Sequence, residues 1–241
     1  MKSDFCIVVG KQTMPVVVNR TKRARYMRLR LNYRNQAAVT APSHCSDREA
    51  LRFVEKHHQW LEQQLARVPK VYKIHPWLLE RPYVSAYGER YKVYIKRTSG
   101  MRSGYLMEKE KREIVFRVPE ARGNVDPDLQ KLMKSFARDV IANRLKYHAQ
   151  RLGLMFNKLG VRDQVSRWGS CSSKGNISLN WRLALIAPEL QDYVLLHELA
   201  HLSEMNHSDR FWKLLISYDP NRVAHEMELN LITAKIMRVG R

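Results

Sequence analysis

The stretch from Tyr193 to His207, YVLLHELAHLSEMNH, contains the pattern on which the interpretation of this chain depends. On a helix, His197 and His201 lie one turn apart on the same face, and Glu198 follows the first of them directly. Two imidazoles at this spacing bind a metal ion, and the adjacent carboxylate can take the proton of a water that lies between them. The pattern therefore predicts a metal-dependent hydrolase in which Glu198 is the catalytic base.

A third protein ligand is expected, because three ligands and one open position are typical of a catalytic zinc site. His207 supplies it if the chain turns back after the helix, and Asn206 is expected in the left-handed conformation that makes such a turn. Glu226 or Glu228 is the alternative, since many zinc hydrolases take a glutamate from a later helix. Imidazole ligands favour zinc among the divalent ions, so one Zn²⁺ per chain is expected.

The composition is that of an ordinary globular protein. Its 241 residues are 44 % hydrophobic, which is enough to bury a substantial core. No apolar run is long enough to span a bilayer, and the first residues do not show an export signal. Cys6, Cys45 and Cys171 are odd in number and widely spaced, which indicates reduced thiols. These features predict a cytoplasmic protein that does not associate with a membrane.

The formal net charge of +20 is concentrated in the first half of the chain. Residues 1–120 carry 25 basic and 11 acidic side chains, whereas residues 121–241 carry 18 and 12. Such a surface attracts polyanions, because neutralised phosphates release their counterions. The same residues also suit the solvated outer faces of strands. A nucleic acid or nucleotide partner for the basic N-terminal region is therefore a hypothesis that rests on charge alone.

The N-terminal half is predicted to be rich in strands. Short runs with β-branched or aromatic residues, bounded by turn residues, predict strands over 5–9, 15–19, 26–32, 37–41, 83–86, 90–96, 104–107 and 113–118. A capping box at Ser46 predicts a helix that ends near Arg67. Residues 71–82 contain two prolines and are expected to form a loop. No internal repeat is evident.

The C-terminal half is predicted to be mainly helical, with one hairpin. A helix is expected from Asp126 to about Leu152, and strands over 161–167 and 176–181 are expected to flank a tight connection. Pro188 opens the helix that carries the histidines, which is expected to end near Met205. The strand over 176–180 is expected to be an edge beside the cleft, where it would pair with an extended substrate.

Four further residues are candidates for contact with substrate. They are Arg167, Trp168, Asn180 and Tyr193. The first two are equally consistent with packing of the hairpin. Tyr193 lies one turn before His197, where it would either stabilise an oxyanion or pack against the helix.

Several of these motifs resemble the YgjP-like metallopeptidase family, whose relatives include the SprT-like and WLM-type zinc proteases. The residues that carry the resemblance are Arg167-Trp168-Gly169-Ser170-Cys171, Ile177-Ser178-Leu179-Asn180, Tyr193-Val194, His197-Glu198-Leu199, His201-Leu202, Asn206-His207-Ser208 and Phe211-Trp212. The likeness is specific over residues 161–218. It implies an α+β fold in which a β-rich part, residues 1–120, precedes a zincin-like catalytic domain, residues 121–241, built on the HExxH helix.

The resemblance also implies that three histidines bind zinc, namely His197, His201 and His207, and that Glu198 is the catalytic base. The leading hypothesis is therefore zinc-dependent cleavage of peptide bonds in a peptide or protein substrate. One alternative is a nucleoside-triphosphate (UTP) pyrophosphatase, an activity that has been attributed to a member of this family. A third hypothesis is a non-enzymatic module that binds nucleic acid and holds a structural zinc, although Glu198 and the lack of a fourth obvious ligand argue against it. A combined hypothesis is a protease that the basic N-terminal region recruits to DNA. The sequence has no Gly-rich phosphate loop, so only the charge supports the nucleotide hypothesis.

Overall fold

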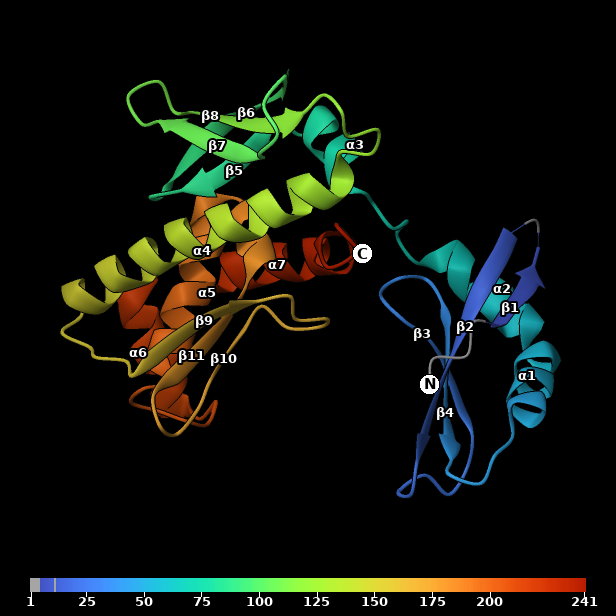
Figure 1. Ribbon diagram of the computed structural model, residues 1–241. Coiled ribbons are helices and arrows are strands. Elements are labelled where there is room, and N and C mark those ends of the chain that lie inside the picture. Colours follow the sequence, from blue (N-terminus) through green and yellow to red (C-terminus); the bar gives the residue numbers. More distant parts are fainter. Residues whose placement is uncertain (1–4, 11) are drawn as a thin grey trace. The chain divides into compact units, whose positions relative to one another are not determined.

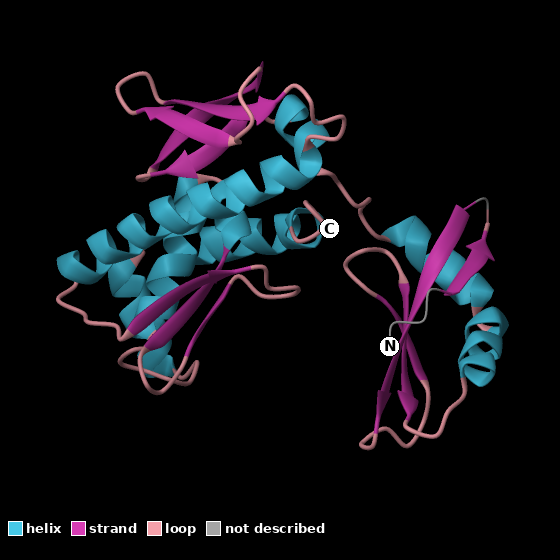
Figure 2. Ribbon diagram, in the orientation of Figure 1, coloured by secondary structure: helices cyan, strands magenta, loops and turns pink. Residues whose placement is uncertain are grey.

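The computed structural model in Figure 1 describes residues 5–10 and 12–241. The chain divides into two compact units, Met1–Val71 and Tyr72–Gly240, called here the N-terminal and the C-terminal unit. Each unit has its own hydrophobic core. Across the described residues there are three small sheets and seven α-helices, which confirms the expected mixed α+β composition (Figure 2).

The N-terminal unit is a four-stranded sheet with two helices. Its elements are β1 (Phe5–Val9), β2 (Gln12–Thr21), β3 (Arg28–Leu31), β4 (Ala37–Pro42), α1 (Asp47–Lys56) and α2 (His58–Arg67). The strand order is β1-β2-β4-β3, in which β2 and β4 are parallel and the other neighbours antiparallel. Alternate side chains point to one face of the sheet, where Met14, Val16 and Val18 of β2 enter the core beneath the helices.

The single helix expected after Ser46 is divided in two. Its capping box is present, since Ser46 Oγ accepts a bond from the Glu49 N–H at 3.2 Å and the Ser46 N–H donates to the Glu49 carboxylate at 2.7 Å. The helical geometry breaks at His57, whose φ is −107° and ψ 19°. As a result, α1 packs on β2 and β4, whereas α2 packs on β1 and β3.

The C-terminal unit begins with α3 (Ile74–Glu80), in the segment that was expected to be a loop. Pro76 is tolerated in the first turn of this helix, where its missing N–H leaves no bond unmade. Ile74, Trp77 and Leu78 are buried at helical spacing and fix α3 to the core. The two prolines predicted a loop, although the apolar residues of this segment have the spacing of a short helix.

A second four-stranded sheet follows, with β5 (Tyr83–Ala86), β6 (Glu89–Thr98), β7 (Gly104–Glu108) and β8 (Glu113–Pro119). Its order is β5-β6-β8-β7, and its pairings are antiparallel, parallel and antiparallel. This is the topology of the N-terminal sheet, so the structure contains a repeat that the sequence did not reveal.

The long helix α4 (Asp126–Arg151) packs against this second sheet. Phe136 of α4 meets Tyr105 and Phe116 of the sheet edge to face, with ring centroids 5.7 and 6.1 Å apart. Because α4 and the second sheet share one core, both belong to the same compact unit, and the chain divides between Val71 and Tyr72. The expected division of function between residues 1–120 and 121–241 stays a prediction.

A three-stranded sheet lies next in the chain. It consists of β9 (Lys158–Arg162), β10 (Gly169–Cys171) and β11 (Asn176–Asn180). The order is β10-β11-β9, with β10 antiparallel and β9 parallel to the central strand β11. The expectation that residues 176–180 form the edge beside the cleft is therefore wrong, because both sides of β11 are paired. The edge strands of this sheet are β10 and β9.

The remaining elements are a 3₁₀ helix (Trp181–Leu185), α5 (Pro188–Ala200), α6 (Asp209–Tyr218) and α7 (Arg222–Ile236). The largely apolar α5 packs against α4, α6, α7, β5 and β10, so its side chains are buried on nearly every side (Figure 1). None of the three cysteines forms a disulfide. No helix in the described ranges combines the length and apolarity needed to cross a membrane.

Candidate metal centre

Helix α5 positions the first two histidines. Pro188 occupies its first turn, and the helix ends at Ala200, earlier than the expected end near Met205. His201 still has helical torsion angles, φ −65° and ψ −14°. It therefore stays one turn beyond His197, and the two ring centroids lie 5.0 Å apart.

The chain then reverses and brings His207 back to the helix. The Glu204 N–H donates to the Ala200 carbonyl at 3.0 Å, and the Ser208 N–H donates to the Asn206 carbonyl at 2.8 Å. Asn206 does not adopt a positive φ, so the predicted left-handed residue is wrong. Successive tight turns reverse the chain instead of a left-handed residue. No single residue type in the sequence predicts such turns.

The three histidines converge on one point. His207 Nε2 lies 3.0 Å from His197 Nε2, and one ring nitrogen of each of these and of His201 lies within 4.8 Å of the others. Nitrogen ligands around a tetrahedral zinc, each at 2.0–2.1 Å, are about 3.3 Å apart. Among the described residues this is the only group of three or more His, Cys, Asp or Glu side chains that could hold a metal ion.

The protonation of two of the imidazoles suits a metal. Burial lowers the pKa of His197 to about 3, and His201 and His207 lower it further, so this ring stays neutral. His201 Nδ1 lies 3.0 Å from the carbonyl oxygen of Glu204. If Nδ1 carries the proton, it donates to this carbonyl and Nε2 is left free to bind the metal. Metal-binding histidines are commonly oriented by such a hydrogen bond to a backbone carbonyl.

Helix α6 orients the exposed His207 ring. Trp212 stacks on it at 5.4 Å with an interplanar angle of 24°, and Phe211 stacks on His201 at 4.6 Å. Arg222 lies over the Trp212 ring at 4.5 Å. From the sequence, Phe211 and Trp212 stood out only as residues that carry the family resemblance, with no signal that they support the histidines.

The two alternative ligands lie outside the histidine cluster. The carboxylate of Glu226 accepts a bond from Arg222 at 2.9 Å, and Glu228 is exposed on α7. Neither belongs to the group that could hold the ion. The geometry therefore favours His207 as the third ligand.

Glu198 is the most unusual carboxylate of the chain. It is only 5 % exposed, and its Oε2 has no hydrogen-bond partner among the described residues. Burial raises its pKa to about 8, although the charge of Arg167 opposes this shift. A Cβ on Gly169 of β10 would lie 2.7 Å from Glu198 Cδ, so only glycine fits at that point of the strand. A buried, unpaired carboxylate beside three convergent imidazoles fits a site that holds a metal ion and a water.

A cavity of about 210 Å³ opens beside the carboxylate. Its walls are Trp168, Gly169, Tyr193, Val194, His197, Glu198, Glu226, Leu229 and Asn230. Trp168 is held by a bond from its Nε1 to Thr233 Oγ1 at 2.9 Å. The Tyr193 ring lies 6.0 Å from the His197 ring, and burial, with the charge of Glu226, raises the pKa of its phenol to about 12. Two of the four predicted substrate contacts, Trp168 and Tyr193, thus reach the cavity.

The other two predicted contacts lie elsewhere. Asn180 is fully buried, and its Nδ2 donates to the carbonyls of Gln164 and Arg167 at 3.0 Å each. It therefore holds the loop between β9 and β10, which argues against a contact with substrate. Arg167 has an exposed side chain whose charge acts on Glu198, and its contact with substrate stays a prediction.

A buried network anchors α5 to α4. Arg144 donates from Nε and Nη2 to the two carboxylate oxygens of Asp192, at 2.7 and 2.5 Å, and His148 Nε2 lies 2.9 Å from the same carboxylate. Burial alone would raise the pKa of Asp192, but the bonds from Arg144 and His148 hold it below its ordinary value. The sequence analysis missed this anchor, although Asp192 stands out as a charged residue inside an apolar helix.

The fold and the site define an α+β protein in which three convergent histidines and a buried carboxylate form a candidate metal site. The family model of the YgjP-like metallopeptidase domain matches residues 25–231, and the chain belongs to this family. The resemblance seen in the sequence is thereby confirmed, and family and histidine cluster together indicate a metal-dependent peptidase.

Two solved structures show weaker likeness. One is the metallopeptidase zymogen abylysin of Pyrococcus abyssi, with 27% identity over 39% of this chain and 94% of that chain and a TM-score of 0.35. The other is the zymogen jannalysin of Methanocaldococcus jannaschii, with 24% identity over 38% and 87% and a TM-score of 0.33. A comparison with curated proteins gave no match.

Proposed function

We propose that this protein is a zinc-dependent peptidase whose zincin-like catalytic half lies within residues 121–241. The observation that supports this most directly is the buried, unpaired Oε2 of Glu198 beside the three histidines. The membership of the chain in a metallopeptidase family supports the same reaction.

In this proposal the metal is held by His197, His201 and His207, and one position stays open for a water or the substrate. Three imidazole ligands favour Zn²⁺, with one ion per chain. When bound, Zn²⁺ would polarise the scissile carbonyl and lower the pKa of a water in the cavity. The stacked Trp212 ring keeps His207 in the orientation that this ligand set needs.

Glu198 moves the proton. The charge of a bound Zn²⁺ would lower the raised pKa of Glu198 and keep this carboxylate ionised. Its free Oε2 then accepts the proton of the attacking water and returns it to the nitrogen of the leaving amine. Tyr193 keeps its phenolic proton at neutral pH, because its pKa is raised to about 12. From the cavity wall this phenol donates a hydrogen bond to the oxygen of the peptide bond under attack.

The edge strand β10 binds the substrate backbone. One side of β10 pairs with β11, and no strand in the described part of the chain pairs with its other side. An extended peptide added there would pass Gly169, where the backbone comes closest to Glu198. This placement brings a peptide bond to the carboxylate without any further movement.

The walls of the cavity favour a peptide over a nucleotide. Among the described residues that line it, none is Lys or Arg, whereas Glu198 and Glu226 are both acidic. A triphosphate would find no lysine or arginine on these walls to bind its charges. The UTP pyrophosphatase hypothesis therefore has less support than peptide cleavage.

The test measures metal content and two activities in parallel. The chain is purified without added metal, its zinc content is determined, and casein and UTP are offered to the wild type and to Glu198→Gln. We expect about one zinc per chain in both proteins and casein cleavage by the wild type alone. Turnover of UTP without casein cleavage, or full activity of zinc-loaded Glu198→Gln, would refute the proposal.

A further inference from the structure

Positive and negative charges are segregated within the N-terminal unit. All of its acidic residues that the structure describes lie on the two helices, namely Asp47, Glu49, Glu55 and Glu62. The loop between β2 and β3, with β3 itself, carries five exposed basic side chains, namely Lys22, Arg23, Arg25, Arg28 and Arg30. None of the five forms an ion pair with a carboxylate of the described residues. Together with Tyr26 we call them the basic surface.

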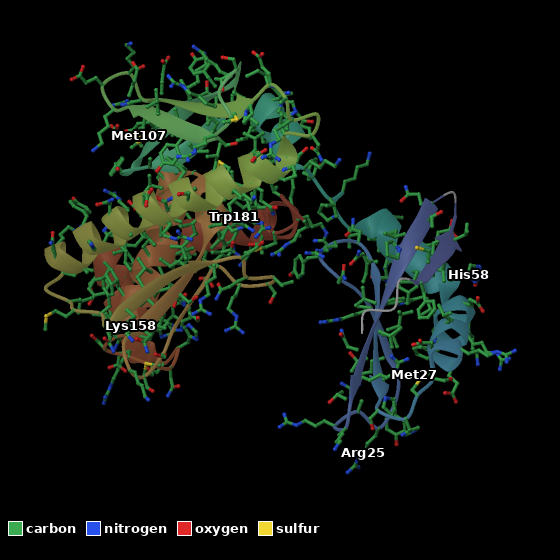
Figure 3. All side chains as sticks on the ribbon, viewed as in Figure 1. Arg25, Met27, His58, Met107, Lys158 and Trp181 are labelled. Carbon is green, nitrogen blue, oxygen red and sulfur yellow. The ribbon has the colours of Figure 1, made fainter. Side chains whose placement is uncertain are left out.

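The pairing of the strands places Arg28 and Arg30 on the face that the helices leave open. Leu29 and Leu31 of β3 pack against the core beneath the helices, so Arg28 and Arg30 point to the opposite face. Arg28 lies opposite Thr40 of β4 in the register. Figure 3 shows Arg25 at the end of the neighbouring loop. The cations therefore form one continuous surface, although they come from a loop and a strand.

Two hollows flank the only exposed aromatic ring of this surface. Tyr26 is 76 % exposed. On one side lies a hollow of about 330 Å³ lined by Thr21, Arg23, Ala24, Arg25, Tyr26, Arg28 and Thr40. On the other lies a hollow of about 390 Å³ that Arg25 and Tyr26 share with His44 and with Glu49 and Phe53 of α1. Both volumes are within the range of about 300–1,000 Å³ for ligand sites, and the first contains no acidic residue.

The second sheet provides an internal comparison, because it has the same topology. Its corresponding open face carries Glu108 and Glu113 among its cations, and Tyr94 donates to the Glu113 carboxylate at 3.2 Å. A face free of acids is therefore not a requirement of this topology. It is a property of the N-terminal copy alone.

We propose that the basic surface binds single-stranded nucleic acid, an activity beyond the proposed peptidase. The arginines contact successive phosphates, and a base stacks on the exposed Tyr26 ring, which is how proteins bind single strands without reading their sequence. Insertion into a membrane would require several exposed hydrophobic side chains, but Tyr26 is the only large one exposed among the described residues of the loop. The hollow beside Arg23 and Arg28 has room for the sugar and phosphate next to the stacked base.

The first experiment measures binding of the full chain to a fluorescein-labelled oligo(dT) of about 20 nucleotides, longer than the about 4–16 that one small domain covers. Fluorescence anisotropy is followed at increasing salt. The double variant Arg25→Glu/Arg28→Glu is compared with Arg48→Glu/Arg52→Glu, which makes the same change in charge on exposed positions of α1. Circular dichroism checks that each variant folds.

We expect the wild type to bind at low salt and to lose affinity steeply as salt is added. Arg25→Glu/Arg28→Glu weakens binding by about tenfold or more. It also lowers the magnitude of the slope of log K against log[salt] by about 1.4, because two single-strand phosphate contacts of about 0.7 each are lost. The matched pair on α1 changes the affinity by about twofold or less. Equal losses in both double variants, or no binding by the wild type at low salt, would overturn the proposal.

A second pair of variants tests the stacked base. Tyr26→Ala should weaken oligo(dT) binding by about 5- to 100-fold, whereas Tyr26→Phe keeps it, because the ring and not the hydroxyl makes the contact. Heparin has no bases, so its affinity should be the same for all three proteins. An equal affinity of Tyr26→Ala and wild type for oligo(dT) would contradict base stacking. Tighter binding to phosphatidylserine vesicles than to oligo(dT) would assign the surface to a membrane and overturn the proposal.

Discussion

Removing the charge of Glu198 should stabilise the metal-free protein, and the gain should grow with pH. The pKa of this carboxyl is about 8 in the folded chain against 4.5 as a free side chain. Below pH 4.5 it is protonated in both states and makes no difference. As pH rises toward 8, only the unfolded state ionises, so the free energy of unfolding falls. Glu198→Gln removes this loss, which amounts to about 1 kcal/mol at pH 5 and about 4 kcal/mol at pH 8.

The assay is urea denaturation of chelator-treated wild type and Glu198→Gln at pH 5 and pH 8. Glu228→Gln is the control, because it makes the same change of side chain at a position that is exposed on the neighbouring α7. Burial also lowers the pKa of His197, but this affects wild type and Glu198→Gln alike, so the difference between the two proteins does not contain it. A stability difference between wild type and Glu198→Gln that does not increase with pH would refute the reasoning that burial controls this carboxyl.

Three further predictions concern the metal centre. His207→Ala should lower zinc affinity in a chelator competition by more than about 100-fold, whereas Glu226→Gln should leave it unchanged; the reverse order would make the glutamate the third ligand. Trp212→Ala should lower zinc affinity by about 10–100-fold through lost support of the imidazole, and an unaltered affinity would argue against that support. Gly169→Ala should keep zinc but lower kcat on casein, while the neighbouring Ser170→Ala should not; equal kcat values would contradict the predicted clash.

The local part of the candidate site could be predicted from the sequence. His197 and His201 are placed by the period of one helix, and Glu198 lies between them by adjacency, so no long-range pairing is needed. The return of His207 could be expected from its spacing, but not the turns that produce it, because backbone hydrogen bonds and not a special residue form them.

The parts that depend on distant contacts could not be predicted. The strand order β10-β11-β9 follows from a parallel pairing across a long loop, which the hairpin pattern around Gly169 did not indicate. Asn180 was expected to contact substrate, yet its side-chain amide donates to the loop carbonyls of Gln164 and Arg167 and accepts a bond from the Arg182 N–H. Pro76 concealed the short helix α3, because only the tertiary structure shows that Ile74, Trp77 and Leu78 are buried on one face of it.

The repeated strand topology also has an evolutionary consequence. The two four-stranded sheets have the same topology, but each has its own hydrophobic core. A substitution in one core therefore does not require the other core to repack. The copy against α4 is constrained by the helix that supports the catalytic half. The core of the N-terminal copy is closed by α1 and α2, so a substitution there does not disturb the helix that carries the histidines.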